Sequence, residues 1–269
     1  MTAITSPRVK APSVRVGPLS TLRQTMTLAW RSLVQIKHNP MELLELSLQP
    51  IMFVLLFVFV FGGAIAGSTE NYIQFALPGI IVQNAVFATL TTAIGLNTDI
   101  AKGVFDRLRS LPIARTAPLA GRVIADLTKQ VWSIAIVLGL GMLLGFRLNN
   151  GPAGVLGATA LLLVVALAVS WVSVLIGVIA SEPEKVQIFA FVLLMPLTFT
   201  SNVFVPSATM PGALRAWAEI NPVSVLADAV RGLLSGGPVA TPILQSLLWA
   251  AAITVVFAPL AIRALRRKT

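Results

Sequence analysis

The sequence predicts an all-α membrane protein with an N-terminal amphipathic interfacial helix, six transmembrane helices and an external re-entrant helical hairpin before the last span. Of its 269 residues, 56% are hydrophobic and 11% are charged, whereas soluble domains carry about 25% charged residues. Apolar runs that are long enough to cross a bilayer, about 20 residues each, recur along the chain. The mean hydropathy of +0.87 agrees with this class.

Positively charged residues alternate with the apolar runs. Of 20 Lys and Arg residues, 17 lie before the first run, between the second run and the start of the third, between the fourth and fifth, or after the last. Because positive residues collect on the cytoplasmic side, we expect a multi-pass cell-membrane protein with both termini in the cytoplasm. The net charge of +10 therefore reflects topology, and we expect no nucleic-acid partner.

The N-terminal part precedes the first span. Residues 1–18 lack an apolar stretch and are predicted to be a disordered cytoplasmic tail, followed by one transmembrane domain over 19–269. Over residues 20–38, apolar side chains including Trp30 occupy one helix face, and Arg, Gln and Thr occupy the other. This pattern favours a helix in the plane of the inner leaflet; an ordinary amphipathic helix packed on protein is the alternative.

Six spans are expected at about residues 43–66, 75–98, 123–146, 154–180, 186–205 and 243–262. Pro50 would then fall in the first turns of the first span, where proline costs little. Ser68–Asn71 is expected to form a short external loop. Asp126 and Lys129 are expected at the cytoplasmic boundary of the third span, because a charge at mid-bilayer costs about 2.5–3.5 kcal/mol.

A basic loop over residues 99–122 separates the second and third spans. Its charges fall at helical spacing from Asp99, so we expect one short helix that ends before Pro112. Phe105, Leu108 and Leu111 recur every three residues as a narrow apolar stripe. This helix could dock into a groove on a soluble partner, or the loop could simply satisfy the positive-inside rule.

Residues 206–242 are predicted to form an external hairpin of two helices, Pro211–Ile220 and Val223–Leu234, separated by Asn221 and Pro222. Each helix is too short to cross a bilayer. Counting one as a span would also place the basic C-terminus outside. Asp228 and Arg231 are spaced to pair. The apolar residues expected to face the bilayer or the fifth and sixth spans are Leu226, Val230 and Leu233.

The residue types of most catalytic and metal sites are missing. His38 is the one histidine and cysteine is absent, so we expect no metal site, disulfide or thiol chemistry. No lysine follows the glycine pattern of a phosphate-binding loop. All ten carboxylates map to span ends or loops, which argues against proton coupling inside the chain. If the protein pumps a substrate, the energy is expected to come from a partner.

Four stretches resemble the permease subunits of type-2 ABC exporters, in particular the daunorubicin-resistance-like drug-export branch. They are RSLVQIKHNP at 31–40, LQPI at 48–51, GVFDRLRSLPIAR at 103–115 with the later Gly121-Arg122, and the region of the hairpin, with VFVP at 203–206, Met210-Pro211 and NPVSVLADAVRGLLSGG at 221–237. They occur in the family's order, and the resemblance extends over nearly the whole chain.

The resemblance implies a non-catalytic permease that exports an amphipathic drug or lipid-like substrate using a separate ABC ATPase in two copies, with a second or homologous permease. ATP and Mg are then expected in the ATPase, and no cofactor in this chain. The resemblance also implies that the basic loop carries the ATPase-coupling helix. Its coupling residues would be Lys102, Phe105, Asp106, Arg107, Leu108, Arg109, Leu111 and Arg115.

Two further sets of residues complete the prediction. The substrate path is expected to be lined by Phe53, Phe57, Asn84, Phe87, Thr91, Phe199 and Asn202, because aromatic side chains with a few polar groups suit an amphipathic molecule; the alternative is that they face lipid or pack the core. The hairpin, with Asn221, Pro222, Asp228 and Arg231, would act as a gate. Competing functions are polysaccharide or lipid export, an ATP-independent channel or secondary transporter, and an intramembrane enzyme.

Overall fold

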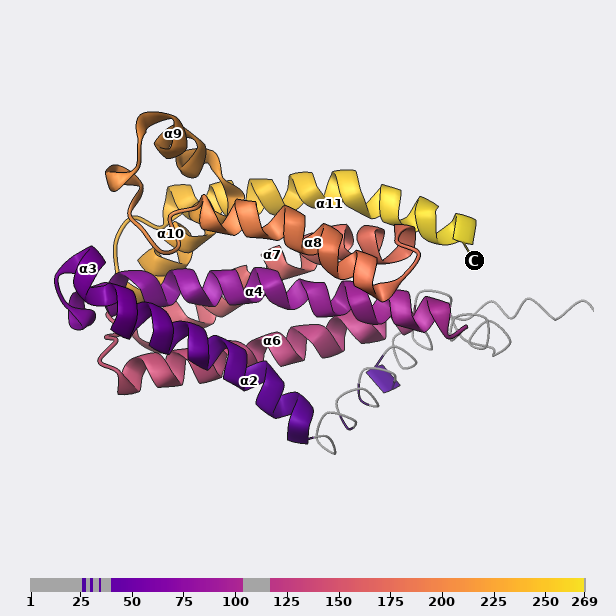
Figure 1. The fold of residues 1–269 in the computed structure, drawn as a ribbon, viewed down its shortest axis with the longest axis horizontal. Helices are drawn as coiled ribbons and strands as arrows, with labels where there is room; N and C mark the ends of the chain where they lie inside the picture. The colour runs from indigo at the N-terminus through magenta and orange to yellow at the C-terminus, as the bar shows by residue number, and fades with distance from the viewer. Residues whose placement is uncertain (1–25, 28–29, 31–33, 35–39, 104–116, 269) are drawn as a thin grey trace, which may run out of the picture.

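The computed structural model describes residues 26–27, 30, 34, 40–103 and 117–268, and every element within them is helical. The long helices lie side by side in an elongated bundle (Figure 1). The elements are α2 (Pro40–Leu55), the π-helix η1 (Leu56–Phe61), α3 (Gly62–Ala66), α4 (Thr69–Ala101), α6 (Ala117–Leu143), α7 (Gly151–Ile179), α8 (Pro183–Phe199), the 3₁₀ turn η2 (Ser207–Thr209), α9 (Gly212–Ile220), α10 (Pro222–Ser235) and α11 (Ala240–Lys268).

Five helical stretches are long and apolar enough to cross a membrane, which identifies a multi-pass membrane protein. They are Ser47–Ala66, Thr69–Ala101, Val123–Leu143, Gly151–Ile179 and Ala240–Leu265. The expected fifth span, 186–205, is shorter than predicted, because α8 ends at Phe199 after 17 residues. Beyond this point the backbone N–H of Asn202 donates to Ser224 Oγ at 3.0 Å. This tertiary hydrogen bond replaces the next bond of the helix.

The first two spans also differ from the sequence prediction. Pro50 lies in the interior of α2 and not in its first turns, because the helix already begins at Pro40. The external loop is a turn at Gly67 and Ser68, shorter than the predicted Ser68–Asn71. Gly67 adopts φ 72°, which favours glycine, and Ser68 Oγ accepts from the Asn71 amide at 3.2 Å, which starts α4 earlier than expected.

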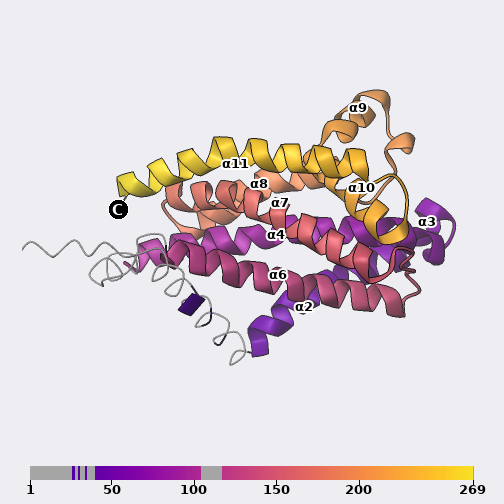
Figure 2. The ribbon, with the colours of Figure 1, turned by 180° about the vertical axis from the view of Figure 1, so that it is seen from behind.

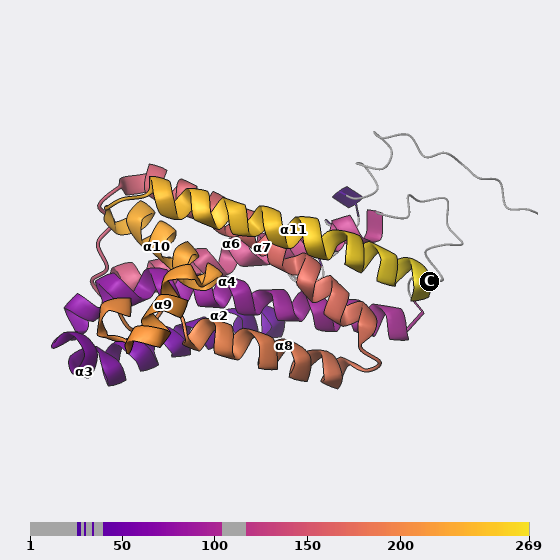
Figure 3. The same cartoon turned by 90° about the horizontal axis from the view of Figure 1, so that it is seen from above.

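Helix α4 lies at the centre of the bundle. Figures 1 and 3 show α2, α6, α7 and α8 around it, and Figure 2 shows α11 against α7 on the far side. Tyr72, Ile73 and Leu77 of α4 are fully buried in the main hydrophobic core. At Gly177 of α7, an added Cβ would lie 2.6 Å from the Ala93 carbonyl oxygen, so glycine permits the close approach of α7 to α4.

Helix α10 packs into the bundle against α4, α7 and α11. Leu226 and Val230 are 1% and 0% exposed, so of the two predicted alternatives they face neighbouring helices and not the bilayer. Leu233 lies against α7, where its Cδ2 would meet a Cβ added at Gly157. Because the second hairpin helix is enclosed, its apolar face contributes to the core. The short α9 projects from the same end of the molecule (Figure 1).

Polar side chains fix both ends of α10. Asn221 Oδ1 accepts from the Val223 amide at 2.8 Å and caps a helix whose first residue is Pro222. At the other end, Asn150 Nδ2 donates to the Gly232 and Leu233 carbonyls at 3.0 and 3.1 Å. The turn between α6 and α7 therefore donates to carbonyls in the last turn of α10, where the helix offers few donors of its own.

Several predicted segments lie outside the described residues. They are the tail 1–18, most of the interfacial helix 20–38 and the loop residues 104–116. Met26, Thr27, Trp30 and Val34 are described and helical. The single helix expected from Asp99 to Leu111 was wrong, because Asp99 belongs to α4, which ends at Ala101. Gly103 follows with φ 65°, a left-handed conformation that stops the helix.

Candidate functional site

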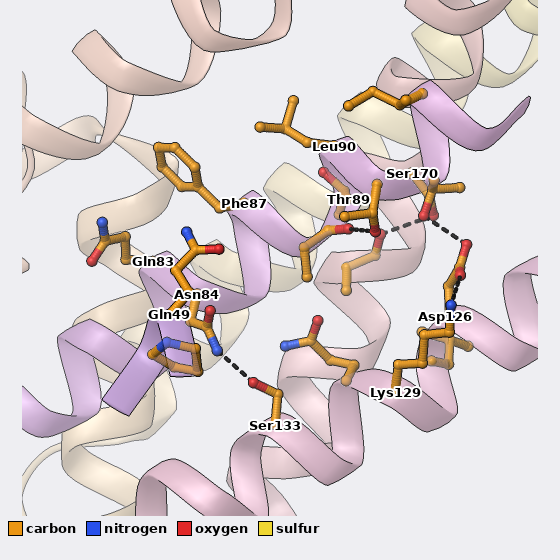
Figure 4. A pocket seen from close by; sticks show the side chains of 18 of the residues that line it. Gln49, Gln83, Asn84, Phe87, Thr89, Leu90, Asp126, Lys129, Ser133 and Ser170 are labelled. Atoms are coloured by element: carbon orange, nitrogen blue, oxygen red, sulfur yellow. Dashed lines mark hydrogen bonds and ion pairs between the residues drawn. The ribbon is translucent and has the colours of Figure 1, made fainter. Parts of the chain in front are cut away.

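A cavity of about 660 Å³ lies among α2, α4, α6, α7 and α8 (Figure 4). Its volume is within the range of small-molecule pockets, about 300–1,000 Å³. Gln49, Pro50 and Phe53 of α2 line one side, and residues from Gln83 to Ile94 of α4 line another. The cavity therefore lies within the helices that qualify as membrane spans, bordered also by α8.

Helix α6 supplies a polar wall to this cavity. Asp126, Lys129, Gln130 and Ser133 lie at positions i, i+3, i+4 and i+7, so they share one helix face. Lys129 Nζ lies 3.9 Å from Asp126 Oδ1, and both side chains are about one fifth exposed, at 23% and 20%. Gln130 is 4% exposed, and its Nε2 has no hydrogen-bond partner within the part of the chain that the structure describes.

Helix α4 faces this wall with polar groups of its own. Thr92 Oγ1 donates to Asp126 Oδ2 at 2.7 Å, and Asn84 Nδ2 donates to Ser133 Oγ at 2.6 Å. Figure 4 shows Asn84 and Ser133 pointing toward each other. These bonds hold α4 and α6 in register and orient the Asp126 carboxylate beside the cavity.

Aromatic side chains from three helices also line the cavity. Phe53 from α2, Phe87 from α4, and Phe191 and Phe199 from α8 line the cavity, together with Met195. Polar and aromatic side chains thus line the same space. A molecule with a polar end and an aromatic or aliphatic body matches this combination.

Stacked rings continue from the cavity toward the end of the bundle that carries α9 and α10. Phe53 and Phe57 have ring centroids 5.9 Å apart, and Phe57 stacks on Phe204 at 4.0 Å with an interplanar angle of 15°. Phe57 also contacts Phe61 at 5.4 Å. Residues four apart lie on one face of a helix, so Phe53, Phe57 and Phe61 place their rings along one side of α2 and η1.

An ion pair and amide bonds hold the segment that carries Phe204. Arg231 Nη1 donates to Asp228 Oδ1 at 2.6 Å, and Asn202 Nδ2 donates to both Asp228 carboxylate oxygens at 2.9 Å. Arg231 also donates to the Phe75 and Asn202 carbonyl oxygens at 3.2 and 3.3 Å, and its guanidinium lies 4.0 Å from the Phe75 ring centroid. Burial lowers the pKa of Arg231, and the Asp228 carboxylate opposes this shift.

The structure brings together five of the seven residues predicted for the substrate path. Phe53, Asn84, Phe87, Thr91 and Phe199 line the cavity. Phe57 and Asn202 do not line it: Phe57 belongs to the ring series, and Asn202 bonds to Asp228.

The predicted coupling residues fall almost entirely outside the described residues. Lys102 is described and lies exposed at the end of α4. Phe105, Asp106, Arg107, Leu108, Arg109, Leu111 and Arg115 are not described.

The polar wall was missed as part of the site by sequence reasoning. Asp126 and Lys129 were assigned only to a membrane boundary, although they lie in the first turns of the Val123–Leu143 span and also face the cavity. The available signal was the helical spacing of these two residues with Gln130 and Ser133 in an apolar segment. Polar residues inside spans usually face the bundle interior. Among the described residues, no group of three His, Cys, Asp or Glu side chains could hold a metal ion.

Comparison with known proteins gives a consistent family match. The family described as ABC-2 type transporter matches residues 23–234. The daunorubicin resistance ABC transporter permease protein DrrB1 of Streptomyces coeruleorubidus is 45% identical over 91% of this chain and 86% of its own length. A probable doxorubicin resistance ABC transporter permease protein, DrrC of Mycobacterium tuberculosis, is 27% identical over 91% and 90%. The putative transport permease ycf38 of Cyanophora paradoxa is 26% identical over 80% and 75%.

Proposed function

This chain belongs to the ABC-2 type transporter family, and we propose that it is the permease subunit of an ATP-driven exporter that moves an amphipathic drug or lipid-like molecule out of the cell. The observation that carries the proposal is the cavity of about 660 Å³ among the spans, which both polar and aromatic side chains line. Such a space accommodates a molecule that is partly apolar and partly hydrogen-bonding. The names of two relatives, which refer to daunorubicin and doxorubicin, support a drug-sized substrate of this kind.

The proposed energy source is a separate ABC ATPase present in two copies. The sequence contains no phosphate-binding loop, so ATP and Mg would bind to that subunit. The basic loop after α4 would dock there through Phe105, Leu108 and Leu111, with the charged residues of the loop setting the pairing. A second permease, identical or homologous, would complete the path.

In the proposed topology α8 is a sixth span. Its 17 residues extend over roughly 25 Å, close to the thickness of a bilayer core. Six spans, preceded by the interfacial helix, place both termini in the cytoplasm of a cell-membrane protein. The basic loop and the turn that contains Lys185 then face the ATPase, and α9 and α10 form the external hairpin.

The stacked rings would close the outer side of the cavity. Phe57 and Phe204 lie beyond Phe53 and Phe199, in the direction of the external hairpin. ATPase closure would move the basic loop at the inner end of α4, and the change in α4 packing would separate these rings. Asp228 and Arg231 would keep the Phe204 segment attached to α10 during this movement.

Docking through the basic loop is tested by co-purification. We expect replacement of both Phe105 and Leu108 by Asp to abolish association with the ATPase while the chain still inserts into the membrane. The matched control is the exchange Phe105→Leu with Leu108→Phe, which retains apolar side chains and should retain association. Normal co-purification of the Asp variant would refute the coupling assignment.

The substrate class is tested with the purified complex. Daunorubicin and a lipid-linked glycan are added separately, and ATP hydrolysis by the complex is measured. We expect the drug to stimulate hydrolysis. Stimulation by the glycan alone would favour the competing function, polysaccharide or lipid export.

A further inference from the structure

We propose that the cavity selects amphipathic organic cations and that the Asp126 carboxylate receives their positive charge. The inference concerns the same cavity and so rests on the proposed function, but it adds the charge of the substrate and the residue that recognises it. Three features of the described walls carry it: the position of Asp126, the aromatic side chains that line the same cavity, and a hydrogen-bond donor in the α6 wall.

The first feature is the carboxylate. Among the described residues that line the cavity, Asp126 and Lys129 carry the charges. Lys129 Nζ lies 3.9 Å from Asp126 Oδ1, whereas Arg231 Nη1 lies 2.6 Å from Asp228 Oδ1 at the same i,i+3 spacing. Coulomb attraction falls with distance, so an arriving cation displaces the Lys129 ammonium at a lower cost than it would break the tighter pair. Thr92 keeps the carboxylate oriented during the exchange.

The second feature is the aromatic wall. The faces of aromatic rings carry negative potential, so they attract cations and disfavour anions. Phe53, Phe87, Phe191 and Phe199 all line the cavity that also contains Asp126. The same chemistry already operates in this chain, where the Arg231 guanidinium lies 4.0 Å from the centroid of the Phe75 ring. A bound anion would be attracted by Lys129 but repelled by the ring faces. A bound cation is attracted by both Asp126 and the ring faces.

The third feature is Gln130, which lines the cavity and is 4% exposed, and whose Nε2 has no partner in the described part of the structure. Buried donors in proteins are normally satisfied. A hydroxyl or carbonyl oxygen near the cationic group of a ligand would accept from this amide. The combined walls therefore suit an organic cation with an apolar body and a neighbouring oxygen acceptor.

The test compares two ions of nearly the same shape and opposite charge, tetraphenylphosphonium and tetraphenylborate. Their Kd values are measured by equilibrium dialysis with the full chain in lipid nanodiscs, after subtraction of the binding to empty nanodiscs. We expect the wild-type chain to prefer the phosphonium. Asp126→Asn should weaken phosphonium binding by about tenfold or more, with borate binding unchanged or strengthened.

Lys129→Gln should have the opposite effect and strengthen phosphonium binding several-fold, because it removes the ammonium that competes for the carboxylate. If Asp126→Asn does not fold, phosphonium binding by Lys129→Gln alone tests the proposal. The matched controls are Glu182→Gln and Lys185→Gln, an exposed pair at 3.5 Å and the same i,i+3 spacing that does not line the cavity. Neither control should change the ratio of the two Kd values.

The proposal is overturned if the wild-type chain binds neither ion or prefers the borate. It is also overturned if the Asp126 and Lys129 variants change both ions alike, which would mean that the pair acts only on folding. The readout uses neither ATP nor the partner subunit. Failure of ATP-driven export would therefore leave a confirmed cation site in place, and loss of the cation preference would leave the export proposal standing.

Discussion

Replacing Arg231 by methionine removes the charge that connects α10 to the Phe204 segment while keeping a long side chain. The substitution removes the 2.6 Å contact with Asp228, the bonds to the Phe75 and Asn202 carbonyl oxygens, and the contact with the Phe75 ring. The Arg231 side chain is 18% exposed, so water cannot fully replace these partners.

The expected loss follows from these contacts. Two long hydrogen bonds contribute about 1 kcal/mol each, and the ring contact adds about 0.5–1 kcal/mol. The Asp228 side chain is 46% exposed and regains water when it loses its partner, so the large penalty of an isolated buried charge does not apply in full. We therefore expect the free energy of unfolding to fall by about 2–4 kcal/mol.

Arg215→Met on α9 is the matched control. Arg215 pairs with Glu219 at 2.9 Å, but both side chains are more than half exposed, at 53% and 54%. Such a surface pair contributes about 0–1 kcal/mol. Unfolding of both variants by sodium dodecyl sulfate in mixed micelles, followed by tryptophan fluorescence, gives the two free energies. Losses that agree within about 0.5 kcal/mol would refute the argument that Arg231 anchors this segment.

Two further stability predictions use the same measurement. Gly177→Ala places a Cβ 2.6 Å from the Ala93 carbonyl oxygen and should cost about 1–3 kcal/mol by separating α4 from α7. In Gly139→Ala the added Cβ meets no neighbouring helix within 4 Å, so the substitution should instead stabilise α6 by about 0.5–1 kcal/mol. Equal changes in the free energy of unfolding would show that the contact with Ala93 does not determine the effect of the added methyl group. Tyr72→Phe removes the 3.0 Å bond from the buried Tyr72 hydroxyl to the Phe204 carbonyl oxygen and should cost about 1 kcal/mol, and an unchanged stability would show that the bond contributes nothing.

Much of the architecture is predictable from the pattern of apolar runs and charges. Five of the expected spans correspond to helices that are long and apolar enough to cross a membrane. They are predictable because a span needs about 20 predominantly apolar residues in succession. The bounds were less predictable. The end of α8 depends on a bond from the Asn202 amide to Ser224, a residue 22 positions away, and local sequence carries no signal for such a contact.

The site was predictable where residue type alone identifies a lining position. Aromatic residues in the first, second and fifth spans were assigned to the path, and Phe53, Phe87 and Phe199 do line the cavity. Phe57 was also assigned to the path, but its ring stacks on Phe204 and does not line the cavity. Asp126 was assigned only to a boundary because the cost of a charge in lipid was considered without the possibility of a polar cavity.

The central claim is that this chain forms a transport path but does not hydrolyse ATP. The most direct measurement is accumulation of an amphipathic fluorescent dye in inside-out vesicles that contain this chain with or without its ATPase. The account predicts ATP-dependent accumulation with the ATPase present, and neither accumulation nor ATP hydrolysis with the chain alone. ATP hydrolysis by the purified chain, or accumulation driven by an ion gradient without the ATPase, would contradict it.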